Sequence, residues 1–473
     1  MTISKSAVRA VVLAAGQGKR MKSSRAKVLH EVLGKPILGW ILDAISALDV
    51  EKVHVVVGHQ AEQVKKYLAT TPQKRPSSAH LQSPQLGTGH ALQIVVPDLG
   101  DFRGTLLVTV GDTPLLTADT LAELVRKHHE QKAVVSLLTA VVDDPKKYGR
   151  IIRDAQGTVE AIVEDKDCTP EQRAINEVNP AIYCFEWPAI SEGLKSLRND
   201  NKQQEYYLTD LVAWARSNGL VIGSSVVADW REVIGVNTRV DLAESMKLMR
   251  DRVVAHLALE SGVTIVDPES TWISPDVMIG EDSTVLPGCY LIGDAKFGRE
   301  CIIGPHTTTG GVVRVGDRTV VAQSLVVNTE IGSDCKVGPF AHLREHAVIA
   351  DHCRVGNFVE IKKSNVAHKS NVSHLSYVGD ADLGSNVNIG AGTITANYNH
   401  ITKQKFRTTI KDGASTGSNS VLVAPITIGV EAVVAAGATI TKDVPAGALA
   451  VRRASQSNLD GWVEKEKRKL SSP

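Results

Sequence analysis

An aliphatic side chain returns every six residues through most of the second half of the chain. The series comprises Ile273, Ile279, Val285, Leu291, Phe297, Ile303, Val315, Val321, Val327, Ile331, Val337, Leu343, Ile349, Val355, Ile361, Val366, Val372, Val378, Leu383, Ile389, Ile410, Thr416, Leu422, Ile428, Val434 and Ile440. Neither a helix of 3.6 residues per turn nor an alternating strand has this period. A solenoid does, because each short repeat buries its apolar residue only against stacked neighbours.

Three hexads per coil would give a triangular prism with short strands as its faces and Gly, Asn or Asp at its turns. We therefore predict a parallel β-helix over residues 263–450, within a C-terminal domain of residues 262–473 that ends in a mobile, charged tail. A β-sandwich of short strands is the alternative. The spacing alone does not fix the hand of the coil.

The first half alternates buried strands with helical patterns. Apolar runs at residues 8–14, 53–57 and 106–110 suit strands that are covered on both faces. Helical patterns at 37–48 and 60–68 separate the first strands. This order predicts a doubly wound (Rossmann-like) α/β domain over residues 1–237.

Residues 237–261 form one predicted helix, whose apolar stripe comprises Val240, Leu242, Met246, Met249, Val253 and Leu257. We expect residues 238–261 to link the two domains. The alternative is a helix packed as an edge of the first domain.

Composition removes several classes of function. Lys and Arg total 53 against 52 Asp and Glu, so no basic field points to nucleic acid or an acidic membrane. No apolar run is long enough to span a membrane and no signal peptide is apparent, so we expect a cytoplasmic protein. The 6 cysteines lack metal-site spacing and are expected to be reduced and buried.

Two glycine-containing turns and one carboxylate supply candidate chemistry. The first strand runs into Gly16 and Gly18, close to Lys19, Arg20 and Lys27, a combination that suits a phosphate. It is neither a Walker motif nor a full dinucleotide fingerprint. A second glycine loop at 81–91 precedes a helix and suits a nucleobase or sugar.

Asp112 follows the strand at 106–110, where such sheets bind ligands. It is a candidate metal ligand, although a turn-capping carboxylate would give the same pattern.

Several motifs in a fixed order carry a resemblance. They are Leu-Ala-Ala-Gly-x-Gly-x-Arg-Met at 13–21, Lys-Val-Leu at 27–29, Gln-Leu-Gly-Thr-Gly-His-Ala at 85–91, Gly-Asp-x-Pro-Leu at 111–115, Tyr-Gly-Arg-Ile at 148–151, Glu-Tyr-Tyr-x-Thr-Asp at 205–210 and Gly-Val-Asn at 235–237. These resemble the sugar-phosphate nucleotidyltransferases. With the hexad half attached, the whole chain is similar to the bifunctional bacterial N-acetylglucosamine-1-phosphate uridyltransferases and glucosamine-1-phosphate acetyltransferases. The resemblance implies that the β-helix is left-handed.

The resemblance implies roles for residues of the first half. Arg20 and Lys27 would stabilise the transferring phosphate, while Asp112 and Asn237 would hold Mg²⁺, which prefers hard oxygen ligands. The residues implied to bind UTP and N-acetylglucosamine 1-phosphate are Leu13, Ala14, Ala15, Gly16, Lys27, Gln82, Gly87, Thr88, Gly111, Asp112, Gly149, Glu164, Asn179 and Asn237. Gly149, Glu164 and Asn179 would line the sugar pocket.

A second group of motifs implies acetyl transfer. They are Asn-Phe-Val-Glu-x-Lys-Lys at 357–363, His-Leu-Ser-Tyr-x-Gly at 374–379, Asn-Ile-Gly-Ala-Gly-Thr at 388–393 and Gly-Ser-Asn-Ser at 417–420. A lone solenoid histidine is otherwise a turn residue. By resemblance, His374 is the base that deprotonates the amine of glucosamine 1-phosphate.

The other implied residues of this site bind its two substrates, glucosamine 1-phosphate and acetyl-CoA. Those for the sugar phosphate are Arg344, Lys362, Tyr377 and Asn388; those for acetyl-CoA are Ala391, Asn397, Tyr398, Ser418, Ala436 and Arg453. A homotrimer, with acetyl sites between neighbouring β-helices, is also implied.

The chain departs from the family pattern at named positions. Lys19 stands in the usual Gly-Thr-Arg, Val110 replaces the Tyr of Tyr-Gly-Asp, and Asn-Thr-Gly-Ile becomes Asn-Pro-Ala-Ile at 179–182. In the second half, Arg-Pro-Gly becomes Arg-Glu-His at 344–346, and Asn-Tyr-Asp-Gly becomes Asn-Tyr-Asn-His at 397–400. Two rival functions remain: a nucleotidyltransferase whose β-helix only trimerises, and a regulatory subunit that binds sugar nucleotides without turnover.

Overall fold

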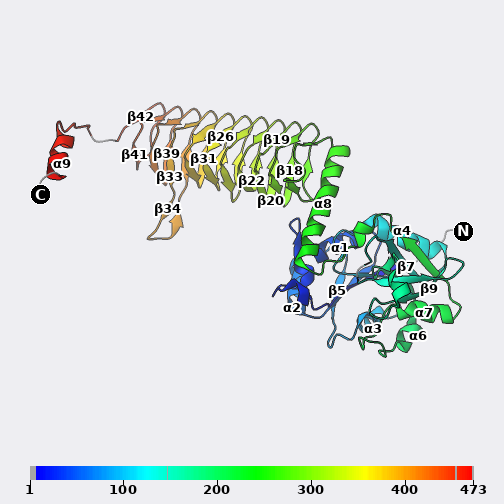
Figure 1. Cartoon of the computed structure of the whole chain (residues 1–473). Coiled ribbons are helices and arrows are strands. Elements are labelled where there is room, and N and C mark those ends of the chain that lie inside the picture. The colour runs from blue at the N-terminus through cyan, green and yellow to red at the C-terminus, as the bar shows by residue number, and fades with distance from the viewer. Residues whose placement is uncertain (1–6, 146, 453–454, 471–473) are drawn as a thin grey trace. The chain divides into compact units, whose positions relative to one another are not determined.

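The computed structural model describes residues 7–145, 147–452 and 455–470 (Figure 1). The chain divides into two compact units, residues 1–250 and 251–473. Each unit is built around its own sheets.

The first unit contains a 10-stranded sheet with the order β5-β4-β1-β6-β11-β7-β10-β8-β9, and β12 pairs with β7. The strands are β1 (Val8–Ala14), β4 (Lys52–Val57), β5 (Ser77–Leu81), β6 (Gly104–Val110), β7 (Val135–Val141), β8 (Gly149–Arg153), β9 (Val159–Val163), β10 (Glu177–Asn179), β11 (Tyr183–Trp187) and β12 (Ile222–Val226). The parallel core is β5-β4-β1-β6, whereas β11 pairs antiparallel with β6. The predicted α/β fold is therefore confirmed, with an antiparallel addition that the pattern did not show.

Helices cover both faces of this sheet. They are α1 (Ile37–Ser46), α2 (Ala61–Thr70), α3 (Thr88–Leu99), α4 (Ala118–Glu130), α5 (Pro170–Arg173), α6 (Ser191–Ser196) and α7 (Asp210–Ser217). Val12 of β1 packs with Ile41 of α1 on one face, whereas Val11 packs with Leu92 of α3 on the other. Burial on both faces explains why the strand is apolar except at Arg9, close to its start.

The predicted helix at 237–261 is observed as α8 (Arg239–Leu259). Its buried apolar side chains are Leu242, Met249, Val253 and Leu257. Val240, which we assigned to the apolar stripe, is 77% exposed, so that assignment was wrong. Val240 lies one residue into the helix, ahead of the first buried turn.

The second unit is a parallel coil, which confirms the predicted β-helix and excludes the sandwich. Thr284 pairs in register with Ile302, and Ile302 with Val320, a spacing of three hexads per coil. The 11-stranded sheet comprises β13 (Thr264–Ile265), β16 (Thr284–Val285), β19 (Ile302–Ile303), β21 (Val320–Val321), β23 (Lys336–Val337), β26 (Arg354–Asn357), β29 (Asn371–His374), β32 (Asn388–Ile389), β37 (Ser415–Thr416), β40 (Val433–Val434) and β42 (Leu449–Ala450).

A 17-stranded sheet completes the coils, which stack in one row (Figure 1). It comprises β14 (Trp272–Ile273), β15 (Met278–Ile279), β17 (Tyr290–Leu291), β18 (Asp294–Phe297), β20 (Thr308–Val315), β22 (Leu325–Ile331), β24 (His342–Arg344), β25 (Ala347–Ile349), β27 (Glu360–Lys362), β28 (Asn365–Val366), β30 (Tyr377–Gly379), β31 (Ala381–Leu383), β33 (Ile394–Ala396), β36 (Thr408–Ile410), β38 (Val421–Val423), β39 (Ile426–Ile428) and β41 (Thr439–Ile440).

The predicted aliphatic series fills the inside of the coil, and the prediction was wrong at one position. Every residue of the predicted series is buried except Val327, which is half-buried; Val326, 1% exposed, takes its place in the core. Thr309 and Thr395 fill two gaps in the series. All six cysteines are free and buried, as predicted.

Two features leave the coil. A hairpin of β34 (Tyr398–Asn399) and β35 (Gln404–Lys405) projects from it, where the sequence showed a polar interruption (Figure 1). The tail that we expected to be mobile contains the helix α9 (Trp462–Leu470), none of whose residues is buried. None of the described helices combines the length and apolar character needed to cross a bilayer.

Candidate active sites

The glycine turn after β1 lines a cavity of about 500 Å³ at the carboxyl end of the parallel strands. Its lining includes the predicted residues Leu13, Ala14, Ala15, Gly16, Lys27, Gln82, Gly87, Thr88 and Asp112. Gly111, also predicted, lies beside the cavity and donates a backbone hydrogen bond to Leu13 (2.9 Å). One cavity thus collects residues from four separate motifs.

The second glycine loop is closed by the Glu-Tyr-Tyr motif at 205–210. Gly87 has φ 106°, and a Cβ there would lie 2.6 Å from the carbonyl oxygen of Tyr206. Gly89 N–H donates to Tyr206 O, and Tyr206 N–H donates to Leu86 O, both over 2.8 Å. Only glycine fits this close approach, which explains both motifs together.

Polar side chains hold the same loop. Gln82 is 4% exposed, and its Nε2 donates to Gly87 O (2.9 Å). Thr88 Oγ1 accepts from the backbone N–H of Leu208 (3.0 Å). Gln85 and Glu205 also line the cavity. We assigned no role to these two residues, although both lie in motifs that the sequence displayed.

Lys27, Asp112 and Asn237 converge from three distant parts of the chain. Lys27 Nζ makes a short ion pair with Asp112 Oδ2 and donates to Asn237 Oδ1 (3.2 Å). The two charged side chains are only 12% and 18% exposed. The Asp112 carboxylate is held by the Lys27 ammonium, so its partner comes from a distant part of the chain. An ammonium group between two hard oxygens shows that the predicted magnesium ligands suit a cation.

Arg20 lies apart from Lys27. It is exposed and lines a second cavity, of about 930 Å³, together with Tyr148, Asp165 and Asn237. The hydrogen bond from Lys27 to Asn237 connects the linings of the two cavities. The two predicted phosphate-stabilising cations therefore face different cavities that meet at Asn237.

The three predicted sugar-pocket residues lie together beside the second cavity. Asn179 of β10 pairs with Gly149 of β8, and a Cβ on Gly149 would lie 3.7 Å from Glu164 Cδ. Asn179 Nδ2 donates to the Tyr183 hydroxyl (2.7 Å). Burial, followed by the charges of neighbouring carboxylates, raises the pKa of Glu164. The three residues that we predicted to line a sugar pocket therefore include a half-buried acid, Glu164.

The replacement of the family's Thr-Gly by Pro180 and Ala181 leaves a strained residue. Ala181 has φ 61°, a left-handed conformation that suits glycine. Its N–H donates to Asn179 Oδ1 (3.1 Å), so the strained turn fixes the side chain of a predicted sugar ligand.

In the second unit, four predicted residues occupy one column across successive coils. Backbone N–H groups of Gly392, Asn419 and Gly437 donate to the carbonyl oxygens of His374, Ala391 and Ser418. The column therefore comprises His374, Ala391, Ser418 and Ala436.

Asn357, on the preceding coil, pairs with His374, and its Oδ1 lies 2.9 Å from His374 Nδ1. The predicted base thus begins the predicted acetyl-CoA groove and has a side-chain partner. A histidine that only formed part of a turn would need neither a place in this column nor a side-chain partner.

The predicted phosphate ligands Arg344 and Lys362 pair in register on adjacent coils. Glu345 binds both, at 2.7 Å from Arg344 and 3.2 Å from Lys362. Arg344 also pairs with Glu360 (2.6 Å). The two cations are therefore already neutralised by carboxylates, one of them at a position where the family has proline.

The remaining predicted residues are spread around the hairpin. Asn397 Nδ2 donates to Asp380 Oδ2 (2.5 Å) and lies 3.4 Å from the Tyr377 hydroxyl. Tyr398 and Asn388 are exposed. Arg453 lies outside the described residues. In the described part of the chain, no hydrogen bond or ion pair joins the Arg344 and Lys362 pair to the His374 column.

Comparisons with known proteins agree with this division. A nucleotidyl transferase family model matches residues 9–233, and a bacterial transferase hexapeptide model of six repeats matches residues 328–363. The chain is thus a transferase that joins a nucleotidyltransferase half to a left-handed parallel β-helix of hexapeptide repeats.

Near full-length relatives narrow the class. "Bifunctional protein GlmU" of Exiguobacterium sibiricum is 48% identical, covering 95% of this chain and 98% of the relative. The proteins of that name from Halalkalibacterium halodurans and Thermoanaerobacter pseudethanolicus are 45% and 46% identical to this chain. Each alignment covers 97% of this chain and 98% of the relative. The chain belongs to the GlmU family. This membership confirms the resemblance and the expected pairing of uridyl transfer with acetyl transfer in one chain.

Proposed function

We propose that the chain makes UDP-N-acetylglucosamine in two steps: its β-helix acetylates glucosamine 1-phosphate, and its α/β unit joins the product to UMP from UTP. One observation supports the proposal: Asp112, in the wall of the cavity of about 500 Å³, and Asn237 both bond to the Lys27 ammonium, and the same chain carries the column that begins at His374 on the β-helix. Residues 1–237 and 262–473 carry the two activities, with residues 238–261 as the link.

In the uridyl step, a phosphate oxygen of N-acetylglucosamine 1-phosphate attacks the α-phosphorus of UTP in line. The bond from that phosphorus to the β-phosphate oxygen breaks, and pyrophosphate leaves. Such a site mainly positions two polyanions and neutralises their charge. The backbone around Gly16 and the ammonium of Lys27 lie on the cavity wall to do so, with Arg20 in the adjoining cavity.

Mg²⁺ would be held by Asp112 and Asn237, and it would supply further charge neutralisation on the phosphates. The fit rests on the two oxygens that now surround the Lys27 ammonium. Gly149, Glu164 and Asn179 would orient the sugar in the pocket that they form together.

In the acetyl step, the amine of glucosamine 1-phosphate attacks the thioester carbonyl of acetyl-CoA. The C–S bond breaks, and CoA leaves as its thiol after its thiolate takes up the proton that His374 has accepted from the amine. His374 accepts the amine proton at Nε2, because Asn357 Oδ1 accepts a hydrogen from Nδ1 and so fixes the tautomer. Ala391, Ser418 and Ala436 would lie along the acetyl-CoA, while Arg344, Lys362, Tyr377 and Asn388 would hold the sugar phosphate.

The working form is a homotrimer. In the described chain, no direct bond joins Arg344 and Lys362, which would hold the sugar phosphate, to the His374 column. A neighbouring β-helix in a trimer would bring one of these two groups to the other. We further place the enzyme in the cytoplasm, where UTP and acetyl-CoA are available.

Two single variants separate the activities. Asp112→Asn should lose pyrophosphate release from UTP and N-acetylglucosamine 1-phosphate while keeping thiol release from acetyl-CoA. His374→Ala should do the reverse. If the purified wild type releases no thiol, the β-helix is only a scaffold. If it releases neither product, the chain binds without turnover.

A further inference from the structure

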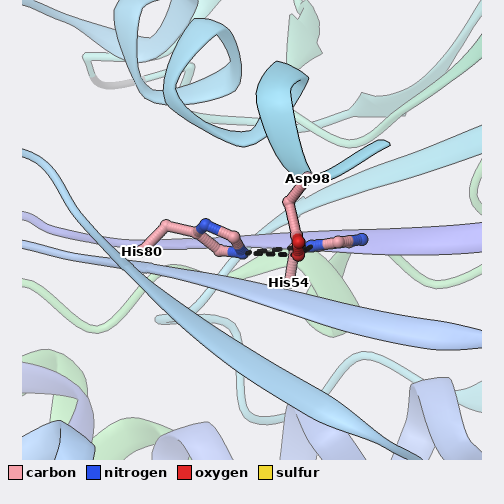
Figure 2. Close-up of side chains that lie close together, drawn as sticks. All are labelled: His54, His80 and Asp98. Carbon is pink, nitrogen blue, oxygen red and sulfur yellow. Dashed lines mark hydrogen bonds and ion pairs between the residues drawn. The ribbon is translucent and has the colours of Figure 1, made fainter. Parts of the chain in front are cut away.

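Four polar side chains converge at the β4–β5 edge of the first sheet, away from both cavities described above. His54 comes from β4, Ser78 and His80 from β5, and Asp98 from the end of α3. Figure 2 shows the Asp98 carboxylate reaching the facing nitrogens of the two imidazole rings. Among the described residues, His54, His80 and Asp98 form the one His, Cys, Asp and Glu group with metal-ligand spacing.

The four facing atoms lie at nearly equal distances from one another. His54 Nδ1 is 3.1 Å from His80 Nε2, and Asp98 Oδ2 is 3.2 Å and 3.6 Å from these nitrogens. Ser78 Oγ lies 3.3 Å, 3.0 Å and 3.3 Å from His54, His80 and Asp98. The four atoms thus form a nearly regular tetrahedron.

This geometry matches one coordination type. A tetrahedron with edges of about 3.3 Å has its centre about 2.0 Å from each corner, the length of zinc–nitrogen and zinc–oxygen bonds. An octahedron does not fit, because a fourth octahedral ligand always lies opposite one of any three adjacent ligands. Four mutually adjacent donors therefore favour a tetrahedral ion over Mg²⁺ or Ca²⁺.

Hydrogen bonds alone do not account for the cluster. Each ring presents one nitrogen and Ser78 one hydroxyl, so at most three hydrogens can lie among the four atoms. Three hydrogens can supply only three of the six close contacts with a hydrogen of their own, so at least three contacts are left without one. A cation at the centre would turn all four lone pairs inward to a common partner.

The charge state of the rings suits a metal. Burial, followed by the charges of His80 and Lys52, lowers the pKa of His54 to about 4. Burial also lowers the pKa of His80. Burial therefore favours the neutral form of both rings, which is the form that binds a metal. Lys52 Nζ donates to the same Asp98 oxygen (2.7 Å), and Arg9 adds a second nearby positive charge.

We propose that His54, Ser78, His80 and Asp98 form a tetrahedral site for a divalent transition metal, with Zn²⁺ as the preferred ion. The site ties β4, β5 and the end of α3 together. Ser78 and His80 lie on β5, and His80 is two residues before Gln82, so the bound ion would anchor the strand that leads into the second glycine loop. Its role is structural support of the nucleotide cavity, and the lysine and arginine beside it weaken the affinity.

The test uses the full-length protein after chelator treatment, titrated with Zn²⁺ by calorimetry in excess Mg²⁺, which occupies the Asp112 and Asn237 pair. We expect one zinc per chain. His80→Gln and Asp98→Asn should each weaken binding by at least about 10-fold. Asp112→Asn and His352→Gln should bind as the wild type does; His352 lies on the β-helix beside His368 without such a cluster.

Co²⁺ on the wild type provides a measurement that does not depend on folded variants. The intense visible bands of four-coordinate cobalt are expected, together with displacement by Zn²⁺. The proposal is overturned if the wild type binds no zinc in excess Mg²⁺, if the His80 and Asp98 variants bind as tightly as the wild type, or if cobalt gives only the weak bands of an octahedral ion.

Discussion

Glu345 and Lys362 form an ion pair of 3.2 Å on neighbouring coils of the β-helix. The other oxygen of the same carboxylate lies 2.7 Å from Arg344. Lys362 and Arg344 hold the pKa of Glu345 below its usual range, against the opposing effect of burial. The carboxylate therefore remains charged at neutral pH and pairs with Arg344 and Lys362, the two cations that we assign to the sugar phosphate.

Removing this charge should favour the substrate. Glu345→Gln should lower KM for glucosamine 1-phosphate by up to about 5-fold, because each exposed ion pair that the phosphate displaces contributes about 1 kcal/mol or less. The kcat of acetyl transfer and all parameters of uridyl transfer should stay constant. Glu330→Gln, on an exposed position of the same sheet, is the control. If Glu345→Gln leaves KM for glucosamine 1-phosphate unchanged or raises it, while Glu330→Gln has no effect, then Glu345 does not compete with the substrate for these cations.

Asn357 should act through His374. Asn357→Ala should lower kcat of acetyl transfer by about 10- to 100-fold, because the ring then loses the acceptor that fixes its tautomer. Asn357→Asp keeps an oxygen acceptor and should retain most of the rate. Steady-state measurement of thiol release checks both variants. Equal rates for Asn357→Ala and the wild type would show that His374 needs no such partner.

Glu164 predicts a pH-dependent stability. Burial and neighbouring carboxylates raise its folded pKa, whereas the unfolded chain has the ordinary value of about 4.3. As pH rises past that value, the unfolded chain loses the proton first, so stability falls until the folded pKa is passed.

Glu164→Gln should therefore raise the free energy of unfolding of the first unit more at about pH 7.5 than at about pH 4.5. Urea unfolding measures this difference. Glu160→Gln, an exposed acid on the strand β9 that precedes Glu164, should change little at either pH. A gain of equal size at both pH values would mean that burial of the ionised carboxylate is not the cause.

Much of the fold follows from the sequence because one physical constraint repeats. Each coil must bury an aliphatic residue against the coils beside it, so the period itself identifies the β-helix. The parallel strands β1 and β6 are mostly apolar because both of their faces are covered. The motif order also placed Lys27, Asp112 and Asn237 in one site, which the structure brings together.

The features that the sequence did not predict depend on strand register, which the six-residue period does not specify. Ile303 pairs with Val321, 18 residues further on, whereas Thr309 pairs with Val326, only 17 residues further on, so the core position falls on Val326 and not on its equally aliphatic neighbour Val327. Glu345 reaches Lys362 only because Arg344 and Lys362 pair across coils. The ligands at His54, His80 and Asp98 come from three elements and share no recognisable spacing.

The register shift is itself testable. Val326→Ala should destabilise the β-helix by about 2 kcal/mol, since it removes methyl groups from a packed core. Val327→Ala should cost less than about 1 kcal/mol, because the side chain is only half-buried. Denaturant unfolding measures the free energy of unfolding of both variants. A larger loss of this free energy for Val327→Ala would mean that Val327, and not Val326, holds the core position.

The coupling of the two activities is the central claim, and one conversion tests it. The purified protein is given glucosamine 1-phosphate, acetyl-CoA, UTP and Mg²⁺, while free thiol and pyrophosphate are followed separately. We predict release of both products, with pyrophosphate appearing after the thiol and only when acetyl-CoA is present. Pyrophosphate that forms only when N-acetylglucosamine 1-phosphate is supplied ready-made, with no thiol released, would contradict the account and leave the β-helix as a scaffold.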